Sequence, residues 1–338
     1  MKQLGFFDES KRMEKLSRLG DSLERLNQIV DWNMFSTILN RALAREHKCP
    51  GGRPPYNSVM LFKVLILQRI YNLSDDQTEY QINDRMSFMR FLGLTIGDNV
   101  PDAKTIWLFR DTLTKANVMP DLFALFNQTL EAAHLITHTG SIVDATFVDA
   151  PRQRNTREEN QTIKSGSVPE EWAANKLRQK DTDARWTKKN NEIHFGYKNH
   201  AKVDVDSKLI ATYSVTNASV HDSKELLGLL DSSDAVLYAD SAYSGVPISE
   251  KLPDNIENRI HEKGYRNHPL NDAQKESNRL KSKVRVRVEH VFGFMTGSMH
   301  GLTLRCIGKL RADFNIGLTN LVYNLCRCEI LRRVNIVG

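Results

Sequence analysis

Apolar and polar residues follow two different periods along this chain, and the change falls near residue 140. Before it, apolar residues recur three and four positions apart, the period of helices that bury one face. The segment RPPYNSVMLFKVLILQRIYNL opens with two prolines and has Asn57 or Ser58 as its N-cap, and Asp102 caps a later amphipathic segment. Residues 1–136 are therefore predicted to be helical throughout. Such a run of short helices fits a helix-turn-helix-like DNA-binding module, and it fits a packing or dimerisation region equally well.

After residue 140, the chain is rich in β-branched and aromatic residues, which favour strands. Three successive strands are predicted in GSIVDATFVDAP, HFGYKNHAKVDVD and KLIATYSVTNAS, and a tight turn at residues 206–208 makes the last two an antiparallel hairpin. A short helix in HDSKELLGLLDS, with Asp222 or Ser223 near its cap, precedes an apolar strand in AVLYADSAY, and helices follow. This order predicts an α/β domain over residues 137–338, a mixed sheet flanked by helices, which is the layout of the ribonuclease H-like fold.

One stretch interrupts this domain. Residues 152–191 are polar, carry scattered charges and have few large apolar residues. Loops of this length inside a domain are usually functional or disordered. We expect a polar insertion beside the first strand, where it can touch a substrate.

Three acidic residues stand in unusual settings. Asp144 and Asp240 lie in short apolar runs that are predicted to be strands, and Glu289 lies among arginines in KVRVRVEHVFGF. An unpaired charge removed from water is costly or becomes neutral, so carboxylates in such places need partners. Three carboxylates brought together would bind a hard cation. Each also has a structural alternative: Asp144 as a hydrogen-bonded core group, Asp240 as a turn or cap residue, and Glu289 as half of an exposed ion pair.

Strand alternation and strand ends refine this picture. Asp149, a competitor to Asp144, is five positions further on and is predicted to face the opposite side of the sheet. Asp240 closes its strand, and the carboxyl ends of strands in open α/β sheets line ligand-binding crevices. Glu289 follows Arg285 by four positions, so the two share one face of a predicted helix.

Basic residues gather before Glu289. The chain has a formal net charge of +6, and residues 275–287 carry six basic groups against the single acid Glu276. Such a stripe suits a nucleic-acid backbone, because neutralising phosphates releases counterions. A solvated helix face is the alternative explanation.

In HFGYKNH, three further residues have the even spacing that places side chains on one face of a strand: His194, Lys198 and His200. Contact with DNA or with the acidic cluster is the functional interpretation, and a structural role for the histidines is the alternative.

The four cysteines have neither the CxxC spacing of a metal site nor that of a disulfide framework. The longest apolar runs are too short to cross a bilayer, and the first residues lack the apolar region of a signal peptide. We expect a cytoplasmic protein.

An ordered series of motifs resembles the DDE transposases of bacterial insertion sequences, specifically the insertion sequence five group. The carboxyl-terminal part of the series is VDATFVDAP, HFGYKNH, VTNASVHD, ADSAYSG and RVRVEHVFG, and the amino-terminal part is GRPPYNSVMLF, YNLSD and PDAKTIWLFR. The resemblance covers nearly the whole chain.

The resemblance implies that Asp144, Asp240 and Glu289 are the catalytic carboxylates, which hold Mg²⁺, or alternatively Mn²⁺, on a ribonuclease H-like sheet. Arg285 matches the arginine that the family places four residues before the glutamate. The chain departs from the family where Ser282 replaces a tyrosine and Thr296 replaces a lysine. Lys281, Lys283 and Arg287 are candidates to compensate as DNA-binding residues.

The implied activity is cleavage at the ends of the element and joining of the freed 3′-hydroxyl ends to target DNA by metal-dependent phosphoryl transfer. The implied partners are double-stranded DNA, as terminal inverted repeats and target, and at least a second copy of the chain in the synaptic complex. We therefore expect the protein to associate with the nucleoid. Two alternatives remain: an inactive or domesticated DNA-binding descendant, and a metal-dependent nuclease on the same fold.

Overall fold

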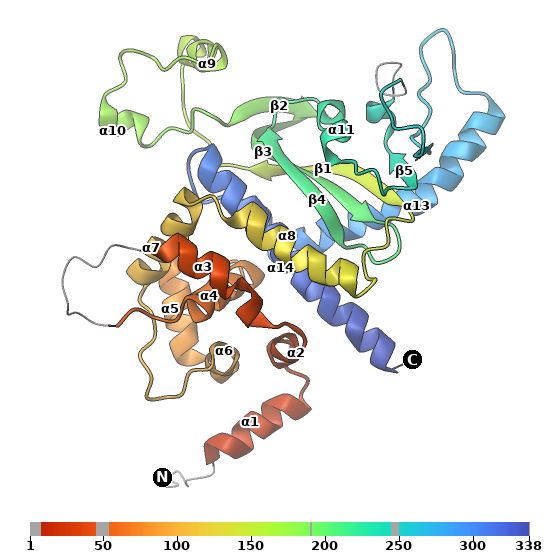
Figure 1. Cartoon of the computed structure of the whole chain (residues 1–338). Coiled ribbons are helices and arrows are strands. Elements are labelled where there is room, and N and C mark those ends of the chain that lie inside the picture. Colours follow the sequence, from red (N-terminus) through yellow and green to blue (C-terminus); the bar gives the residue numbers. More distant parts are fainter. Residues whose placement is uncertain (1–7, 45–53, 190, 245–249, 338) are drawn as a thin grey trace. The chain divides into compact units, whose positions relative to one another are not determined.

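Short helices make up the amino-terminal part of the chain. The computed structural model describes residues 8–44, 54–189, 191–244 and 250–337, so Gly52, Arg53 and Gly245 of the motifs above lie outside the described residues. The chain divides into two units, the first of residues 1–126 with 324–338 and the second of residues 127–323. The helices of the amino-terminal part are α1 Asp8–Arg18, α2 Ser22–Ile29, η1 Trp32–Phe35, α3 Ser36–Leu43, α4 Ser58–Ile70, α5 Asp75–Asp84, α6 Met86–Leu92, α7 Ala103–Lys115 and α8 Met119–Ala132 (Figure 1).

The predicted cap residues begin two of these helices. The Asn57 side chain accepts a hydrogen bond from the backbone N–H of Met60 at the start of α4, and Asp102 accepts one from Thr105 at the start of α7. A side-chain acceptor at this position satisfies one of the free N–H groups of the first helical turn. Local sequence therefore fixes where α4 and α7 begin, and the prediction is confirmed there.

The second unit is built on a six-stranded mixed sheet (Figure 1). Its central strand β1 pairs with β3 antiparallel on one side and with β5 parallel on the other, and β6 continues the sheet beyond β5. The far side of β3 pairs first with β2 and then with β4, both antiparallel. The strands are β1 Ser141–Asp149, β2 Arg185–Lys189, β3 Glu192–Asp204, β4 Ile210–Asn217, β5 Val236–Ala239 and β6 Glu257–Asn258. The predicted mixed sheet and the β3–β4 hairpin are thus present.

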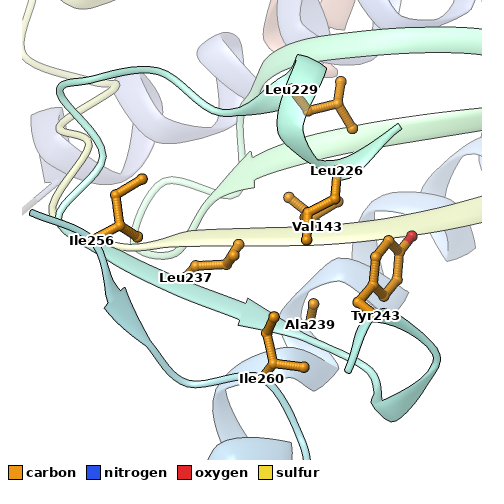
Figure 2. Packing of buried hydrophobic residues seen from close by; sticks show 8 residues of the cluster. All are labelled: Val143, Leu226, Leu229, Leu237, Ala239, Tyr243, Ile256 and Ile260. Atoms are coloured by element: carbon orange, nitrogen blue, oxygen red, sulfur yellow. The ribbon is translucent and has the colours of Figure 1, made fainter. Parts of the chain in front are cut away.

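Both faces of this sheet are covered. Successive residues of β1 point to opposite faces. Val148 packs on the face that buries Ile316 of α14 (Lys309–Val337), and α13 (Asp272–Thr296) contacts β1 and β5. Val143 belongs to the cluster on the other face, drawn in Figure 2, which comprises Val143, Leu226, Leu229, Leu237, Ala239, Tyr243, Ile256 and Ile260. The sheet is therefore an inner layer, and its apolar strands are buried as their sequences require.

The segment before β5 differs from the prediction. A single helix was expected over residues 221–232, whereas the chain forms a 3-10 turn η2 (Asp222–Lys224) and a short α11 (Leu226–Leu229). The cap is His221, whose ring nitrogen accepts from the N–H of Ser223, and not Asp222 or Ser223. Asp222 is instead buried and bonded to Lys198, which removes it from the capping role.

The polar insertion is folded, in contrast to the loop or disordered segment that its composition predicted. It contains α9 (Arg157–Lys164), α10 (Ala174–Leu177) and β2. Its anchor is the buried carboxylate of Asp181, which accepts hydrogen bonds from the Tyr197 hydroxyl at 2.9 Å and the Gly308 N–H at 3.1 Å. One acidic residue thus ties the insertion to the sheet and to the segment before α14, a long-range contact that composition does not reveal.

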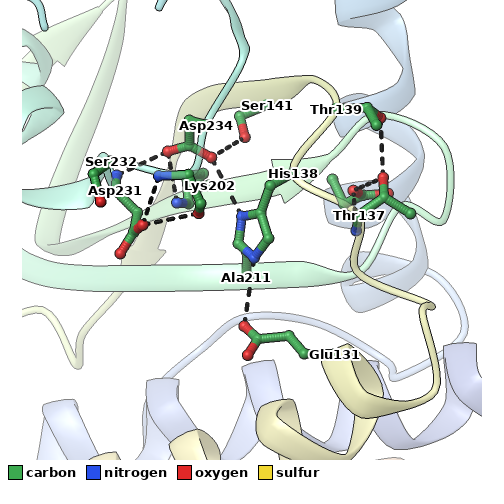
Figure 3. Close-up of polar contacts among 12 residues, drawn as sticks. Glu131, Thr137, His138, Thr139, Ser141, Lys202, Ala211, Asp231, Ser232 and Asp234 are labelled. Carbon is green, nitrogen blue, oxygen red and sulfur yellow. Dashed lines mark hydrogen bonds and ion pairs between the residues drawn. The ribbon is translucent and has the colours of Figure 1, made fainter. Parts of the chain in front are cut away.

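A buried ion pair between Asp234 and Lys202 joins the sheet strands near the amino-terminal end of β1 (Figure 3). Asp234 accepts from the Lys202 ammonium at 2.8 Å, the Ser141 hydroxyl at 2.7 Å and the Asp231 N–H at 2.8 Å. Burial would raise the pKa of Asp234, but these donors lower it below its ordinary value. The carboxylate therefore links β1, β3 and the turn before β5 in its ionised form.

None of the helices in the described part of the chain has the length and apolar character that a membrane span requires.

Replacing Asp234 by Ala should reduce the free energy of unfolding by about 3–5 kcal/mol, because the Lys202 charge would be left buried without its partner. Urea denaturation measures this. Asp231→Ala, at an exposed position in the same turn, is the matched control and should cost less than about 1 kcal/mol. Equal losses for the two variants would contradict the assignment of the buried pair.

Candidate active site

The pairing of β1 with β5 places two aspartates at adjacent positions. Val143 of β1 is the register partner of Ala239, the last residue of β5, and the strands run parallel, so Asp144 and Asp240 come next on the two segments. Asp240 ends its strand and caps the turn η3 (Ser241–Tyr243), where its carboxylate accepts from the Ser241 N–H at 2.6 Å. The two carboxylates therefore meet at the carboxyl end of β5, the edge at which open α/β sheets bind ligands.

Glu289 comes from α13. This 25-residue helix begins with a capping box between Asn271 and Gln274 and buries Val288 against the sheet unit. Residues 284–289, in which valines alternate with charged residues, are thus helical, as predicted. Helical spacing places Arg285 and Glu289 on one face, and the Arg285 Nη2 donates to the Glu289 carboxylate at 3.1 Å.

The Arg285 guanidinium joins the helix to the sheet. Its Nη1 donates to the Asp144 carboxylate at 2.9 Å while its Nη2 holds Glu289. A planar guanidinium with donors in a fixed fork can hold two carboxylates at once, which a lysine cannot do with the same geometry. Arg285 therefore brings Asp144 and Glu289 to one place although they are far apart in sequence.

Exposure differs among the three acids. The side chain of Asp144 is 19% exposed, that of Asp240 47% and that of Glu289 57%. Burial raises the pKa of Asp144 above its ordinary value, the Ala145 N–H and Arg285 lower it, and the charge of Asp240 raises it again. The charge of Asp240 thus acts on Asp144, and a cation at this edge would stabilise both ionised carboxylates.

The carboxylate oxygens of the three acids are suitable ligands for a hard cation, since Mg²⁺ prefers oxygen ligands of this type. Among residues 8–44, 54–189, 191–244 and 250–337, no group of three or more His, Cys, Asp or Glu side chains is arranged as a metal site. Arg285 occupies an oxygen of Asp144 and one of Glu289. The residues therefore fit a divalent cation by chemistry, and a cation would compete with Arg285 for Asp144 and Glu289.

Family models match both parts of the chain. Residues 136–325 match the model described as "Transposase DDE domain", and residues 11–112 match "Transposase domain (DUF772)". The chain belongs to the DDE transposase family. A cryo-EM structure of a piggyBac transposase synaptic complex with hairpin DNA is similar with a TM-score of 0.47 and 10% sequence identity, covering 96% of this chain and 78% of that chain.

The basic residues of α13 in this transposase chain lie in different settings. Lys283 is exposed. The Lys281 ammonium donates to the Ile260 carbonyl at 3.1 Å, and Arg287 donates to the Val205 carbonyl at 2.7 Å. Lys283 is thus available to an external phosphate, while Lys281 and Arg287 hold α13 against neighbouring segments.

The three residues of HFGYKNH do share a face of β3, but they extend from the surface into the core. His194 is partly exposed and stacks on Phe147 at 4.0 Å between ring centroids. Lys198 is buried and bonded to the Asp222 carboxylate at 2.7 Å. His200 is fully buried, with its Nε2 2.8 Å from the Thr216 hydroxyl. Of the three, only His194 is partly exposed.

Two neighbours of the acidic edge were not predicted. Tyr243, three residues after Asp240, is buried beneath it. His261 lies with its Nδ1 3.9 Å from the Asp240 carboxylate and its Nε2 3.3 Å from the Ser282 hydroxyl. Ser282, one of the departures from the family pattern, therefore sits on the Asp240 side of α13. Thr296, the other, contacts only its own helix in the hydrogen bonds described.

Asp149, the competing aspartate, faces the other side of the sheet, as alternation predicted, and lies 3.6 Å from His194. It takes no part in the Arg285 contacts.

Burial lowers the pKa of His200 to about 4, although the charge of Asp222 acts in the opposite direction. The unfolded chain takes up this proton near pH 6.5, so the contribution to stability is complete above pH 6.5 and is lost as the pH falls toward 4. Between pH 7.5 and 5, His200 should account for a loss of about 2 kcal/mol in the free energy of unfolding.

Urea denaturation at the two pH values tests this. His200→Asn should show a smaller loss by about that amount. His290→Gln, at an exposed position of α13, is the control and should keep the wild-type pH dependence. An unchanged pH dependence in His200→Asn would show that His200 is not the buried neutral group described.

Proposed function

We propose that this transposase cleaves DNA at the ends of its insertion element, of the insertion sequence five group, and joins the 3′-hydroxyl ends to target DNA. One observation carries the proposal: the register of β1 and β5 sets Asp144 beside Asp240, and Arg285 links Asp144 to Glu289 of α13. The three acids come from two strands and one helix that are distant in sequence. Membership of the DDE family supports reading this convergence as a catalytic site.

We further propose a ribonuclease H-like fold for the catalytic domain, residues 137–338. The support is a mixed sheet in which one strand pairs antiparallel and parallel on its two sides and is covered on both faces. The helical region, residues 1–136, is proposed as the DNA-binding or dimerisation part. Two element ends must meet during joining, so at least two copies of the chain would assemble on DNA.

In this proposal Asp144, Asp240 and Glu289 hold Mg²⁺ or Mn²⁺. When bound, such ions activate an attacking oxygen and stabilise a leaving oxygen at phosphorus. The chain supplies the ligands with different degrees of shielding: Asp144 is the most buried and Glu289 the most exposed. This gradient suits a site that opens toward DNA on the α13 side.

Arg285 has two roles in the proposal. Its contacts with Asp144 and Glu289 reduce the repulsion between acids that β1 and α13 bring together. A phosphate group also forms bidentate bonds with a guanidinium, so the DNA backbone would compete with the carboxylates for Arg285. Lys283 is exposed on the same helix, two positions before Arg285, and would add a phosphate contact.

The test uses Asp144→Asn, Asp240→Asn and Glu289→Gln, with Asp149→Asn as the matched control on the other face of β1. Each of the three variants should lower cleavage of element ends and joining of pre-cut ends by at least about a thousandfold, because a transition-state contribution of roughly 4 kcal/mol is removed. Binding to element ends should persist, since it depends chiefly on basic residues. Asp149→Asn should retain the wild-type rate.

The outcomes separate the alternatives. Undiminished joining by the Asp240 variant would contradict the site. Wild-type protein that cuts ends but never joins them would indicate a nuclease, and protein that binds ends without cutting would indicate an inactive DNA-binding descendant.

A further inference from the structure

The polar insertion between β1 and β3 is strongly basic. Residues 152–189 carry ten basic residues against six acidic ones, an excess of four, while the whole chain has an excess of only six. Figure 1 shows α9 and α10 outside the sheet, on the side of β2. A DNA duplex carries one negative charge about every 1.7 Å along its axis, so a folded segment of this charge is complementary to DNA.

One face of α9 is packed against the rest of the insertion. Ile163 is buried, and the Glu159 carboxylate accepts from the Trp172 indole N–H at 2.6 Å and from the Lys176 ammonium at 2.7 Å. The Ile163 carbonyl also accepts from the Arg185 guanidinium of β2 at 3.1 Å. A helix this short is unstable by itself in water, so these contacts hold α9 in place beside the sheet.

The opposite face of α9 is exposed and basic. Arg157, Gln161 and Lys164 are spaced four and three positions apart, so they share the side of the helix that lies away from Ile163. All three are exposed, and neither basic group forms an ion pair with any residue that the structure describes. Glu158, the nearest acid in sequence, lies about a quarter turn to one side. The two positive charges are therefore available to an external anion.

The end of β1 fixes how far this face lies from the acids. β1 ends at Asp149, five residues beyond Asp144, and a strand rises about 3.3 Å per residue, so the insertion leaves the sheet roughly 17 Å from Asp144. Successive nucleotides of one strand in B-DNA are about 3.4 Å apart along the axis. A duplex that has one phosphate at the acids and follows β1 would meet the insertion about five base pairs away.

We propose that the insertion is a second DNA-binding surface, in which Arg157 and Lys164 of α9 bind phosphates at least about five base pairs from the phosphate at the acids. Gln161, between them, can donate its amide N–H to the same backbone. Such contacts position the duplex without reading its sequence. The inference rests on the proposed function for the choice of DNA as partner, and it adds a surface separate from α13.

The experiment measures DNA binding by the double variant Arg157→Gln/Lys164→Gln. Fluorescence anisotropy is recorded between about 50 and 200 mM KCl, on a duplex of the terminal inverted repeat alone and on one with about 15 base pairs of flanking DNA added. The slope of log affinity against log salt should become shallower by about 2, and the affinity near 100 mM KCl should fall at least about tenfold. The melting temperature should stay unchanged, because both side chains are exposed.

The two duplexes distinguish which DNA the insertion binds. A loss already present on the inverted repeat alone assigns the surface to element DNA. A loss that appears only with the added flank assigns it to the DNA outside the element. Either result supports the proposal.

Two control variants separate local contacts from net charge and from damage to the fold. Lys176→Gln/Lys309→Gln removes the same charge from lysines that the structure bonds to Glu159 and Asp313, and it should keep the wild-type salt dependence. Arg157→Lys/Lys164→Arg retains both charges and should also bind as the wild type does.

Wild-type affinity and salt slope in Arg157→Gln/Lys164→Gln on both duplexes would overturn the proposal. So would an equal loss in Lys176→Gln/Lys309→Gln, since the effect would then be one of net charge. Wild-type protein that binds DNA through Arg157 and Lys164 but neither cuts nor joins it would refute the proposed function alone. Wild-type protein that joins DNA, with binding independent of these two residues, would refute the second surface alone.

Discussion

The parallel pairing of β1 with β5 is the constraint on which the rest of the candidate site depends. It makes Val143 and Ala239 neighbours, and the next residue on each strand is an aspartate. A shift of one residue in either strand would turn its carboxylate to the other face of the sheet. The apolar cluster beneath the pair, which includes Val143, Ala239 and Tyr243, prevents that shift by requiring these side chains to be buried. The packing of this core therefore also fixes the geometry of the candidate active site.

Arg285 extends the same constraint to α13. The helix buries Val288 and Val291 on one side and presents Glu289 on another, but this alone leaves its position along the sheet undetermined. The Arg285 contact with Asp144 helps to fix that position, together with the contacts of Lys281 and Arg287 to neighbouring segments. In this structure the guanidinium neutralises the two acids, and under the proposed function a phosphate and a cation would compete for these groups. Burial raises the pKa of Asp144, and the Arg285 contact acts against this shift.

Local signals in the sequence predicted much of the fold. Asn57 and Asp102 cap the helices that they were expected to begin, and the antiparallel hairpin of β3 and β4 was read from its turn. Asp144, Asp240 and Glu289 were selected from strand ends, helix spacing and the family resemblance. The predictions from sequence were wrong where long-range contacts determine the structure. The polar insertion is folded and is tied to the sheet by the bonds of Asp181 to Tyr197 and Gly308. Asp222 bonds to Lys198 and does not cap the segment before β5. The burial of His200 and the position of His261 beside Asp240 depend on the tertiary fold in the same way.

The central claim is that the three acids form one cation site on DNA. The most direct measurement is an anomalous difference map from crystals of the protein bound to element-end DNA and Mn²⁺. The account predicts a Mn²⁺ peak coordinated by Asp144 and Asp240, with Glu289 facing it and Arg285 moved from Asp144 to a DNA phosphate. A peak at other residues, or an intact Asp144–Arg285 pair in a complex that joins DNA, would contradict it.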